Sequence, residues 1–311
     1  MGFRVVFAGS PHFAIPALAG LAGAQELVGV LTQPDRPRGR GRIPQPTAVK
    51  AWALEHGVEA FTPASLTDRN VREAIRARQP DFLIVAAYGL LFPENWLALP
   101  ALGVLNLHAS LLPRWRGASP IEYSLLAGDQ WSGVSIQKLV KRLDAGPVYH
   151  QRQISLSQGE TQSSLYDRLS KLGAETLLDV LATWGRVGPT PQDERFTTLA
   201  PKINLRQAAI SWNRPARVIE RQVRAFESHP GAWALHDGRR ITILEAQALD
   251  QYAMQLPGIF ERGPEETIQV ATSQGFLSVR RLRPEGSRDM AATQWLNGLR
   301  SARPFRFHPV S

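Results

Sequence analysis

The segment "NLHAS" (106–110) holds two side chains whose types and spacing suit chemistry at a carbonyl group. Asn106 and His108 are two residues apart, so on a strand both point to the same face. Asp144 lies in the turn "LDAGP" (143–147), from which a carboxylate can reach back to an imidazole. The carboxamide and a protonated imidazole can stabilise the oxyanion that forms when an amine attacks a carbonyl. The carboxylate can hold the imidazole and help to take up the amine's proton.

A purely structural role is the alternative for the same three residues. Asn106 and His108 could cap the end of a strand, and Asp144 could fix a turn, as Asp before Ala-Gly-Pro often does. Because all three occur in a loop-rich region between strands, where functional residues concentrate, their joint presence favours catalysis.

The first half of the chain alternates apolar strands with helices. Strands are predicted at 3–10, 26–32, 81–89 and 103–109, and helices at 46–57 and 69–79. This alternation predicts an α/β, Rossmann-like domain whose mostly parallel sheet is covered on both faces. Asn106 and His108 then lie near the carboxyl end of a strand, where ligands enter such sheets.

Further along the chain the pattern changes. Two strands (133–140 and 148–156) flank the turn that carries Asp144, and a long helix follows at 161–184. After this helix the chain becomes rich in Gly, Pro, Thr and Gln, as is typical of a linker. A helix at 214–226 and short strand-like pieces separated by Gly and Pro turns then predict a small, OB-like β-barrel.

We therefore predict three parts. A catalytic domain spans 1–188, a linker spans 189–204, and a C-terminal β-barrel domain spans 205–311.

The composition argues against several kinds of chemistry. Without cysteine the chain has no disulfide, thiol nucleophile or Cys-ligated metal, which fits a reducing cytoplasm. The seven histidines show no metal-ligand spacing, so we expect no metal. The turn "AGSPHF" (8–13) lacks the three glycines of a dinucleotide fingerprint, and no Walker A run occurs. No apolar run approaches membrane-spanning length, and we expect neither a signal peptide nor an anchor.

The positive charge favours a polyanionic partner. The formal net charge is +9, and residues 202–311 carry 16 Lys and Arg against 10 Asp and Glu. Basic proteins that bind no polyanion are common, but the run "DRPRGRGR" (35–42) is more specific. It places four arginines on alternate positions: Arg36, Arg38, Arg40 and Arg42. Arginine forks can reach phosphates and base edges, and glycines let the loop fold around an RNA end, so we predict RNA contact here.

Four segments occur in the order and at the spacing typical of one enzyme family. They are "FAGSPHFAIPAL" (7–18), "TQPDRPRGRG" (32–41), "NLHASLLPRWRGASPI" (106–121) and "LDAGP" (143–147). With them the chain resembles the methionyl-tRNA formyltransferases. The resemblance covers nearly the whole chain, because "APKINLRQAAISW" (200–212) is similar to the start of that family's C-terminal domain. The central segment is specific for transferases that use 10-formyltetrahydrofolate.

The resemblance implies roles for individual residues. The implied catalytic residues are Asn106, His108 and Asp144, and the implied folate-binding residues are Ser110, Leu111, Leu112 and Pro113. The arginine loop is implied to contact the acceptor stem of the tRNA. Two segments depart from the family pattern: Val140 stands where an acidic residue is common, and "AFESHPGAW" (225–233) replaces an Asn-Pro-Trp-Pro-like segment.

The expected activity is formyl transfer from 10-formyltetrahydrofolate to the α-amino group of initiator methionyl-tRNA, which gives N-formylmethionyl-tRNA for translation initiation. We expect a cytoplasmic monomer with no membrane partner. One alternative is a folate-dependent enzyme that formylates a small amine, or the related 10-formyltetrahydrofolate hydrolase. The arginine loop and the basic C-terminal region argue against both. A non-catalytic RNA-binding protein is the other, and the intact Asn106, His108 and Asp144 argue against that.

Overall fold

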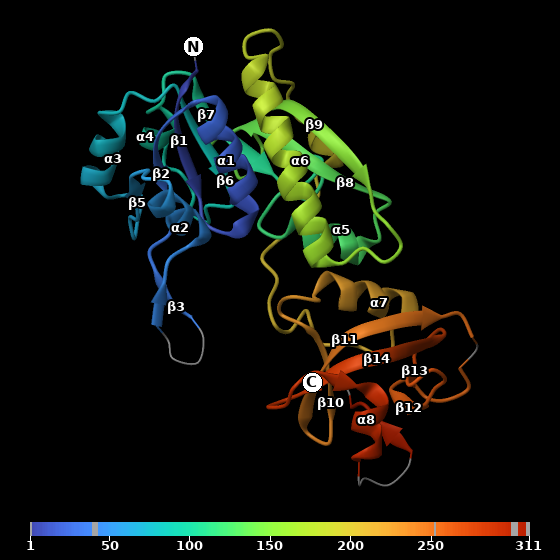
Figure 1. The fold of residues 1–311 in the computed structure, drawn as a ribbon. Coiled ribbons are helices and arrows are strands. Elements are labelled where there is room, and N and C mark those ends of the chain that lie inside the picture. Colours follow the sequence, from blue (N-terminus) through green and yellow to red (C-terminus); the bar gives the residue numbers. More distant parts are fainter. Residues whose placement is uncertain (1, 39–42, 252, 300–303, 309–311) are drawn as a thin grey trace. The chain divides into compact units, whose positions relative to one another are not determined.

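The computed structural model describes residues 2–38, 43–251, 253–299 and 304–308. These residues form two compact units. The first unit comprises Met1–Pro120, Trp131–Ser155 and Tyr166–Pro201, and the second comprises Ile121–Gln130, Leu156–Leu165 and Lys202–Ser311. Figure 1 draws both units.

The first unit is built on a seven-stranded sheet. In order across the sheet the strands are β5 (Ala60–Phe61), β2 (Glu26–Leu31), β1 (Arg4–Gly9), β6 (Phe82–Ala86), β7 (Gly103–His108), β8 (Trp131–Lys138) and β9 (Val148–Ser155). The strands from β5 to β7 are parallel, whereas β8 and β9 are antiparallel to their neighbours. The prediction of a Rossmann-like, mostly parallel sheet is therefore confirmed.

The central strands are apolar because both faces of the sheet are covered. Every residue of β6 is buried, and so are the last five residues of β1. Since successive side chains on a strand point to opposite faces, burial without alternation requires cover on both sides. These strands therefore form the core that holds β7 in place.

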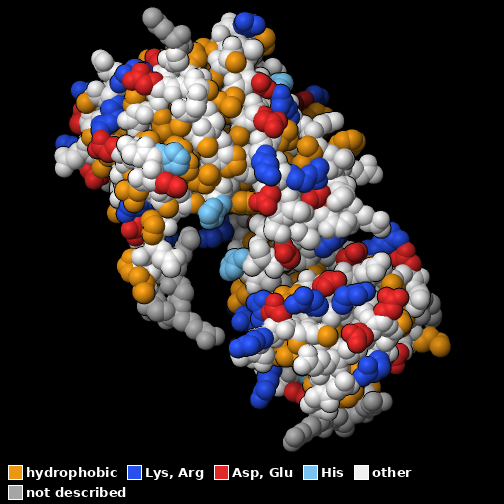
Figure 2. Space-filling view, in the orientation of Figure 1, with side chains coloured by type: hydrophobic (Ala, Val, Ile, Leu, Met, Phe, Trp, Pro, Cys, Tyr) orange, Lys and Arg blue, Asp and Glu red, His pale blue; other side chains and the backbone are white. Residues whose placement is uncertain are grey.

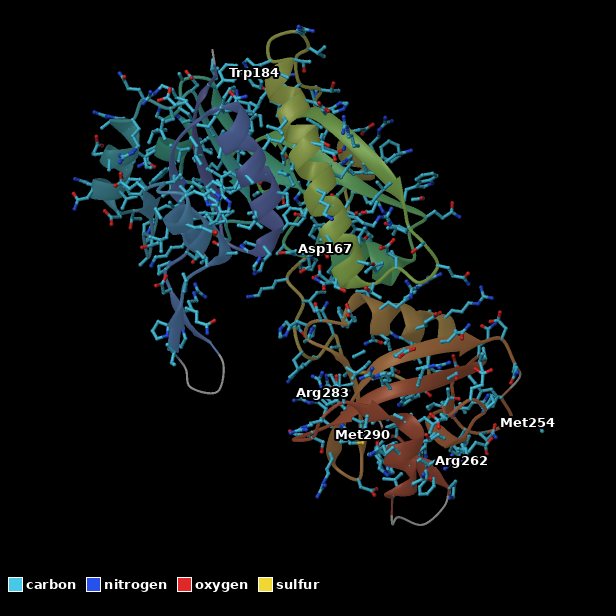
Figure 3. The ribbon with its side chains drawn as sticks, in the orientation of Figure 1. Asp167, Trp184, Met254, Arg262, Arg283 and Met290 are labelled. Carbon is cyan, nitrogen blue, oxygen red and sulfur yellow. The ribbon has the colours of Figure 1, made fainter. Side chains whose placement is uncertain are left out.

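Helices and one short hairpin complete the first unit. The helices are η1 (His12–Ala14), α1 (Ile15–Ala24), α2 (Ala48–Glu55), α3 (Arg69–Arg76), α4 (Glu94–Leu97), η2 (Glu194–Phe196) and most of α6 (Gln162–Ala182). Side chains set the helix starts: the Thr47 hydroxyl accepts from Lys50 N, and Asp68 caps α3. Trp184, labelled in Figure 3, follows α6 and contacts Phe82 edge to face. The hairpin joins β3 (Arg36–Arg38) to β4 (Ile43–Gln45).

The second unit is built on a curled antiparallel sheet. Its strand order is β10 (Ala232–His236), β11 (Arg239–Leu249), β14 (Phe276–Pro284), β13 (Ile268–Ala271), β12 (Ile259–Arg262) and β16 (Phe305–Arg306), with β15 (Met290–Ala291) beside β14. The amide of His308 donates to the carbonyl of Leu235 at 2.8 Å, so the chain after β16 meets β10 and the two ends of the sheet come together. This is the small barrel-like domain that the sequence predicts.

The core of the second unit is aromatic. Trp212 stacks on Phe307, and Phe260 stacks on Trp295, all four side chains being buried. The helices of this unit are α7 (Ala216–Ala225), α8 (Ala292–Asn297) and most of α5 (Pro120–Ala127). Trp212, two residues before Arg214, is therefore a core residue.

Candidate active site

Two of the three candidate catalytic residues lie on β7, the last parallel strand. Asn106 and His108 are 8% and 6% exposed. Asn106 is paired across the sheet with Gln137 of β8, and His108 with Ser135. A strand position two residues further along returns to the same face, so both side chains point to one side of the sheet near the carboxyl end of β7.

Asp144, 7% exposed, lies in the turn after β8 and has a left-handed backbone with φ +46°. Its Oδ2 accepts a hydrogen bond from Gly117 N at 2.9 Å, and its Oδ1 accepts one from Gln137 Nε2 at 3.0 Å. Asp144 Oδ1 is 3.8 Å from His108 Nδ1. The structure therefore brings the carboxylate beside the imidazole, and Gln137 links it to the strand position opposite Asn106.

The imidazole of His108 also contacts the loop that follows β7. Its Nε2 lies 2.9 Å from the carbonyl oxygen of Trp115. Because a carbonyl oxygen only accepts hydrogen bonds, Nε2 carries a proton in this arrangement and donates it. Nδ1 faces Asp144 beyond hydrogen-bond distance, so the carboxylate faces the imidazole without a direct hydrogen bond.

The loop 110–117 is tied to β8 and β9. Leu112 N donates to Ser135 Oγ at 3.0 Å, and Ser135 Oγ donates to Ser110 O at 2.6 Å. Gln151 Nε2 donates to Leu112 O at 2.9 Å. The four residues implied to bind folate, Ser110, Leu111, Leu112 and Pro113, thus lie in one anchored stretch directly after His108. Leu112 and Pro113 also line a cavity of 380 Å³ that extends along β9.

Two glycines allow loops to approach closely at this site. Gly117 has φ +125°, and a Cβ atom there would lie 2.5 Å from Ala200 O. At Gly146 a Cβ atom would collide with Lys138 O. We call the carboxyl ends of β7 and β8, together with loops 110–117 and 142–146, the catalytic corner. Its loops require glycine at these two positions because backbone occupies the space of a side chain.

Two family models match most of the chain. The family model described as "Formyl transferase" matches residues 4–181, and "Formyl transferase, C-terminal domain" matches residues 202–300. The chain belongs to the formyltransferase family. It is 42% identical to a methionyl-tRNA formyltransferase of Methylococcus capsulatus, over 94% of this chain and 96% of that protein. It is 41% identical to a methionyl-tRNA formyltransferase of Xanthomonas campestris, over 96% of this chain and 98% of that protein.

Solved structures of formyltransferases share the fold. An N-formyltransferase from Helicobacter canadensis, solved with folinic acid and dTDP-3-aminofucose, has a TM-score of 0.68 at 16% identity and covers 93% of this chain and 100% of that one. A methionyl-tRNA formyltransferase from Clostridium thermocellum has a TM-score of 0.56 at 17% identity and covers 80% of this chain and 95% of that one. At these identities the likeness concerns the fold alone.

The arginine loop of this formyltransferase is only partly described. Arg36 begins β3 and is exposed; one of its terminal nitrogens donates to Gln33 Oε1 at 3.1 Å. The backbone of Arg38 pairs with that of Ile43. Arg40 and Arg42 lie outside the described residues. Figure 1 shows the described part of the hairpin extending away from the seven-stranded sheet.

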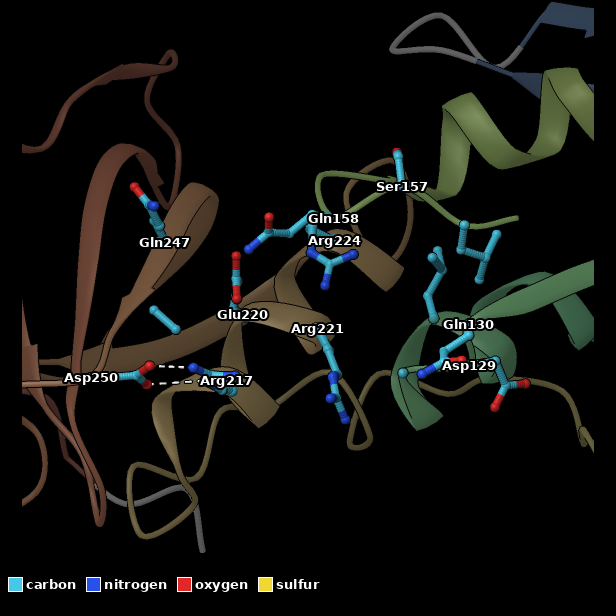
Figure 4. Close-up of a pocket in the computed structure, with 14 residues that line it drawn as sticks. Asp129, Gln130, Ser157, Gln158, Arg217, Glu220, Arg221, Arg224, Gln247 and Asp250 are labelled. Atoms are coloured by element: carbon cyan, nitrogen blue, oxygen red, sulfur yellow. Dashed lines mark hydrogen bonds and ion pairs between the residues drawn. The ribbon is translucent and has the colours of Figure 1, made fainter. Parts of the chain in front are cut away.

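The second unit of this formyltransferase has a polar pocket of 360 Å³ beside α7, drawn in Figure 4. Arg217, Arg221 and Arg224 line it, and Arg217 pairs with Asp250. Burial raises the pKa of Glu220 and lowers that of Arg224. Figure 2 shows Lys and Arg side chains interspersed with Asp and Glu over this unit, which is the pattern of an ordinary solvated face.

Two glutamines that bond to the Asp144 turn were not predicted from the sequence. Gln137 is fully buried and holds Asp144, and Gln192 bonds to the backbone of the same turn. A single Gln inside the apolar strand "GVSIQKLV" (133–140) was a readable signal for Gln137. No local pattern singles out Gln192.

Among the described residues, no group of three or more His, Cys, Asp or Glu is placed to hold a metal ion. None of the described helices combines the length and apolarity needed to cross a bilayer.

Proposed function

We propose that the chain transfers the formyl group of 10-formyltetrahydrofolate to the α-amino group of methionyl-tRNA, and so produces N-formylmethionyl-tRNA. The observation that carries the proposal is an Asn, His and Asp cluster in a chain that aligns nearly end to end with methionyl-tRNA formyltransferases at 41–42% identity. The roles assigned below to single residues are part of this proposal.

The reaction exchanges one amide-like bond for another. The amine nitrogen bonds to the formyl carbon, the bond from that carbon to the donor nitrogen breaks, and a proton from the amine ends on the donor nitrogen. An α-amino group has a reference pKa of about 7.7–8.0, so a useful fraction is neutral and nucleophilic near pH 7. Positioning and charge stabilisation, rather than a strong base, are what the protein has to supply.

We assign oxyanion stabilisation to Asn106 and His108. Both are largely buried, so their donors act where water screens weakly. The Nε2–H of His108 donates to the Trp115 carbonyl in this structure, and in the reaction it exchanges that oxygen for the oxyanion. Asp144 faces the other ring nitrogen and helps to take up the amine's proton.

We assign binding of the folate donor to the stretch Ser110, Leu111, Leu112 and Pro113. Its hydrogen bonds to Ser135 and Gln151 support the assignment, because they fix the loop beside His108 before any ligand arrives. Backbone groups with apolar side chains suit a flat, polar-edged pterin.

We assign tRNA binding to the arginine loop and to the basic C-terminal domain. The arginines of the loop are Arg36, Arg38, Arg40 and Arg42. In this proposal residues 1–188 are the catalytic, folate-binding domain, 189–204 the linker and 205–311 the tRNA-binding domain. Since charged initiator tRNA is used in the cytoplasm, we place the reaction there. A monomer suffices, because one chain supplies both the catalytic corner and the basic unit.

The test is direct formylation. The protein is incubated with 10-formyltetrahydrofolate and charged initiator tRNA, and the aminoacyl group is then analysed by mass spectrometry. We expect N-formylmethionine that appears only when protein and donor are both present. Methionyl-tRNA left unmodified under conditions in which an amino sugar nucleotide is formylated would replace this proposal with the small-amine alternative.

A further inference from the structure

The segment 190–200, which is part of the predicted linker, is hydrogen-bonded to two sides of the catalytic corner. Thr190 and Val148, at the start of β9, exchange both backbone hydrogen bonds at 2.8 Å. Further along, Ala200 N donates to Arg116 O at 2.7 Å. The segment therefore runs between the strand after the Asp144 turn and the loop after His108.

Gln192 uses both ends of its amide at this point. Its Oε1 accepts from Arg116 Nε at 2.9 Å and from a terminal nitrogen of the same guanidinium at 2.7 Å. Its Nε2 donates to Asp144 O at 2.8 Å and to Gly146 O at 2.7 Å. The reverse orientation would set NH₂ against a guanidinium and the oxygen against two carbonyls, so the network fixes the amide.

Arg116 and Glu194 hold Gln192 in turn. Arg116 is 4% exposed and donates to both carboxylate oxygens of Glu194, at 3.1 and 3.0 Å. Arg142, two residues before Asp144, also pairs with Glu194. Hydrogen bonds from Arg116 lower the pKa of the Glu194 carboxyl, so the carboxylate that compensates the buried guanidinium stays ionised.

The Asp144 turn has reason to need such support. A left-handed backbone at a non-glycine residue is strained and persists only when its surroundings over-determine it. The two carbonyls that Gln192 binds belong to Asp144 itself and to Gly146. Without Gln192 the backbone of the turn loses this support, and only Gly117 N and Gln137 still hold the carboxylate, so we expect the carboxylate to shift relative to His108.

We propose that Gln192 is a positioning residue, which holds the 144–146 turn so that the Asp144 carboxylate faces His108. Arg116 and Glu194 act through Gln192. The effect on turnover rests on the proposed formyl transfer, whereas the effect on the turn does not.

The discriminating variant is Gln192→Glu. It keeps the size of the side chain and the contact with Arg116, but it sets an oxygen against two carbonyls in place of an NH₂ group. We expect kcat to fall about 10- to 100-fold, as for a small misplacement of a catalytic group, while both KM values stay within about twofold. Gln153→Glu, on the exposed face of β9, is the matched control and should keep wild-type kcat.

A second variant and a second background separate positioning from folding. Gln192→Met removes the hydrogen bonds without adding charge and should lower kcat in the same way. In an Asp144→Asn background the Gln192→Glu effect should shrink to less than about twofold, because residues that act as one unit are not additive. Wild-type kcat in both variants, or an undiminished effect in the Asp144→Asn background, would overturn the proposal.

Hydrogen exchange gives a readout that needs no substrate. Amides in 142–146 should exchange faster in both Gln192 variants, while those of β1 and β6 keep their protection. Faster exchange throughout the first unit would show a general loss of stability and overturn the positioning role. If wild-type protein fails to formylate methionyl-tRNA, the proposed function fails, and the exchange result still decides the role of Gln192.

Discussion

Arg116 in the catalytic corner and Arg217 on α7 are both ion-paired, but their surroundings are opposite. The side chain of Arg116 is 5% exposed and bonds to Gln192 and Glu194. That of Arg217 is 68% exposed and pairs with Asp250, which is 67% exposed. Water competes for an exposed pair, which therefore contributes little, whereas a buried guanidinium has to keep its partners. The catalytic corner thus holds the charge of Arg116 in a fixed geometry, whereas Arg217 on α7 is paired only with an exposed side chain.

The partners of the charged groups explain the difference. In the catalytic corner they include backbone atoms: Gly117 N binds the Asp144 carboxylate, and Trp115 O accepts from His108. On α7 the partner of Arg217 is another exposed side chain, which can move with it. Substitutions in the catalytic corner should therefore act on kcat, and substitutions elsewhere on binding or stability.

The largest expected effect is that of His108→Ala. Removing an oxyanion donor typically costs about 10²–10³ in rate, so we expect kcat to fall by about that factor. Affinity for tRNA should remain at the wild-type level, because no role in tRNA binding is assigned to His108. Single-turnover formylation and equilibrium tRNA binding measure the two quantities.

The control for this experiment is His56→Ala, which removes an exposed histidine at the end of α2. We expect wild-type kcat from it. Substantial residual turnover in His108→Ala, or a parallel drop in tRNA affinity, would show that the imidazole does not stabilise the oxyanion. The catalytic corner would then not differ from α7 in acting on kcat.

The sequence was sufficient to predict the elements that carry a strong hydrophobic pattern. The apolar runs of β1, β6 and β7 predicted their strands because burial on both faces leaves a continuous hydrophobic signal. The pair Asn106 and His108 was readable because the strand period of two is local. Short elements such as β5 and α4 were missed, since two to four residues carry too little pattern to be distinguished from a loop.

The support of Asp144 could not be predicted in the same way. Gln192 follows Asp144 by 48 residues along the chain, and β9 and α6 lie between them. Gln192 lies in the stretch 185–204, whose Gly, Pro and Thr residues are typical of a linker, so nothing in the local sequence distinguishes a spacer from a segment that holds the site. Only the three-dimensional structure brings its amide to the turn.

A smaller effect is expected from the combined substitution of Arg38, Arg40 and Arg42 by Ala. These residues are proposed to bind phosphates, so KM for tRNA should rise, by about tenfold, while kcat at saturation changes little. The salt dependence of binding should flatten by about 0.7–0.9 in log–log slope for each phosphate that the variant no longer neutralises. Steady-state kinetics and binding at several salt concentrations give both values.

A matched control removes the same charge from another place. Substitution of Arg69, Arg72 and Arg76 by Ala strips three arginines from α3, of which Arg69 and Arg76 are exposed and Arg72 is half-buried. If both triple variants raise KM equally, net charge rather than the arginine loop governs binding. An unchanged KM in the loop variant would show that the arginine loop does not bind tRNA.

The smallest expected effect is on stability, at Glu220 of α7. Burial raises the pKa of its carboxyl, and the nearby Arg224 offsets this only in part. The folded state therefore binds this proton more tightly than the unfolded state, so ionising Glu220 destabilises the fold. The penalty is absent below the pKa of the unfolded state, grows as the pH rises through the folded pKa, and is fully present above it.

Glu220→Gln should therefore raise Tm at pH 7, by no more than about 2 °C because Glu220 is only half-buried. The gain should shrink as the pH falls toward 4.5, the ordinary pKa of the carboxyl, and vanish below it, where Glu220 becomes neutral in both states. Thermal unfolding from pH 4 to pH 8 measures this, with exposed Glu261→Gln on β12 as the control for removing a charge. A lower Tm at pH 7 would mean that the charge of Glu220 is needed by its arginine neighbours. In that case α7 holds a fixed network like that of the catalytic corner, and the contrast between the two regions is wrong.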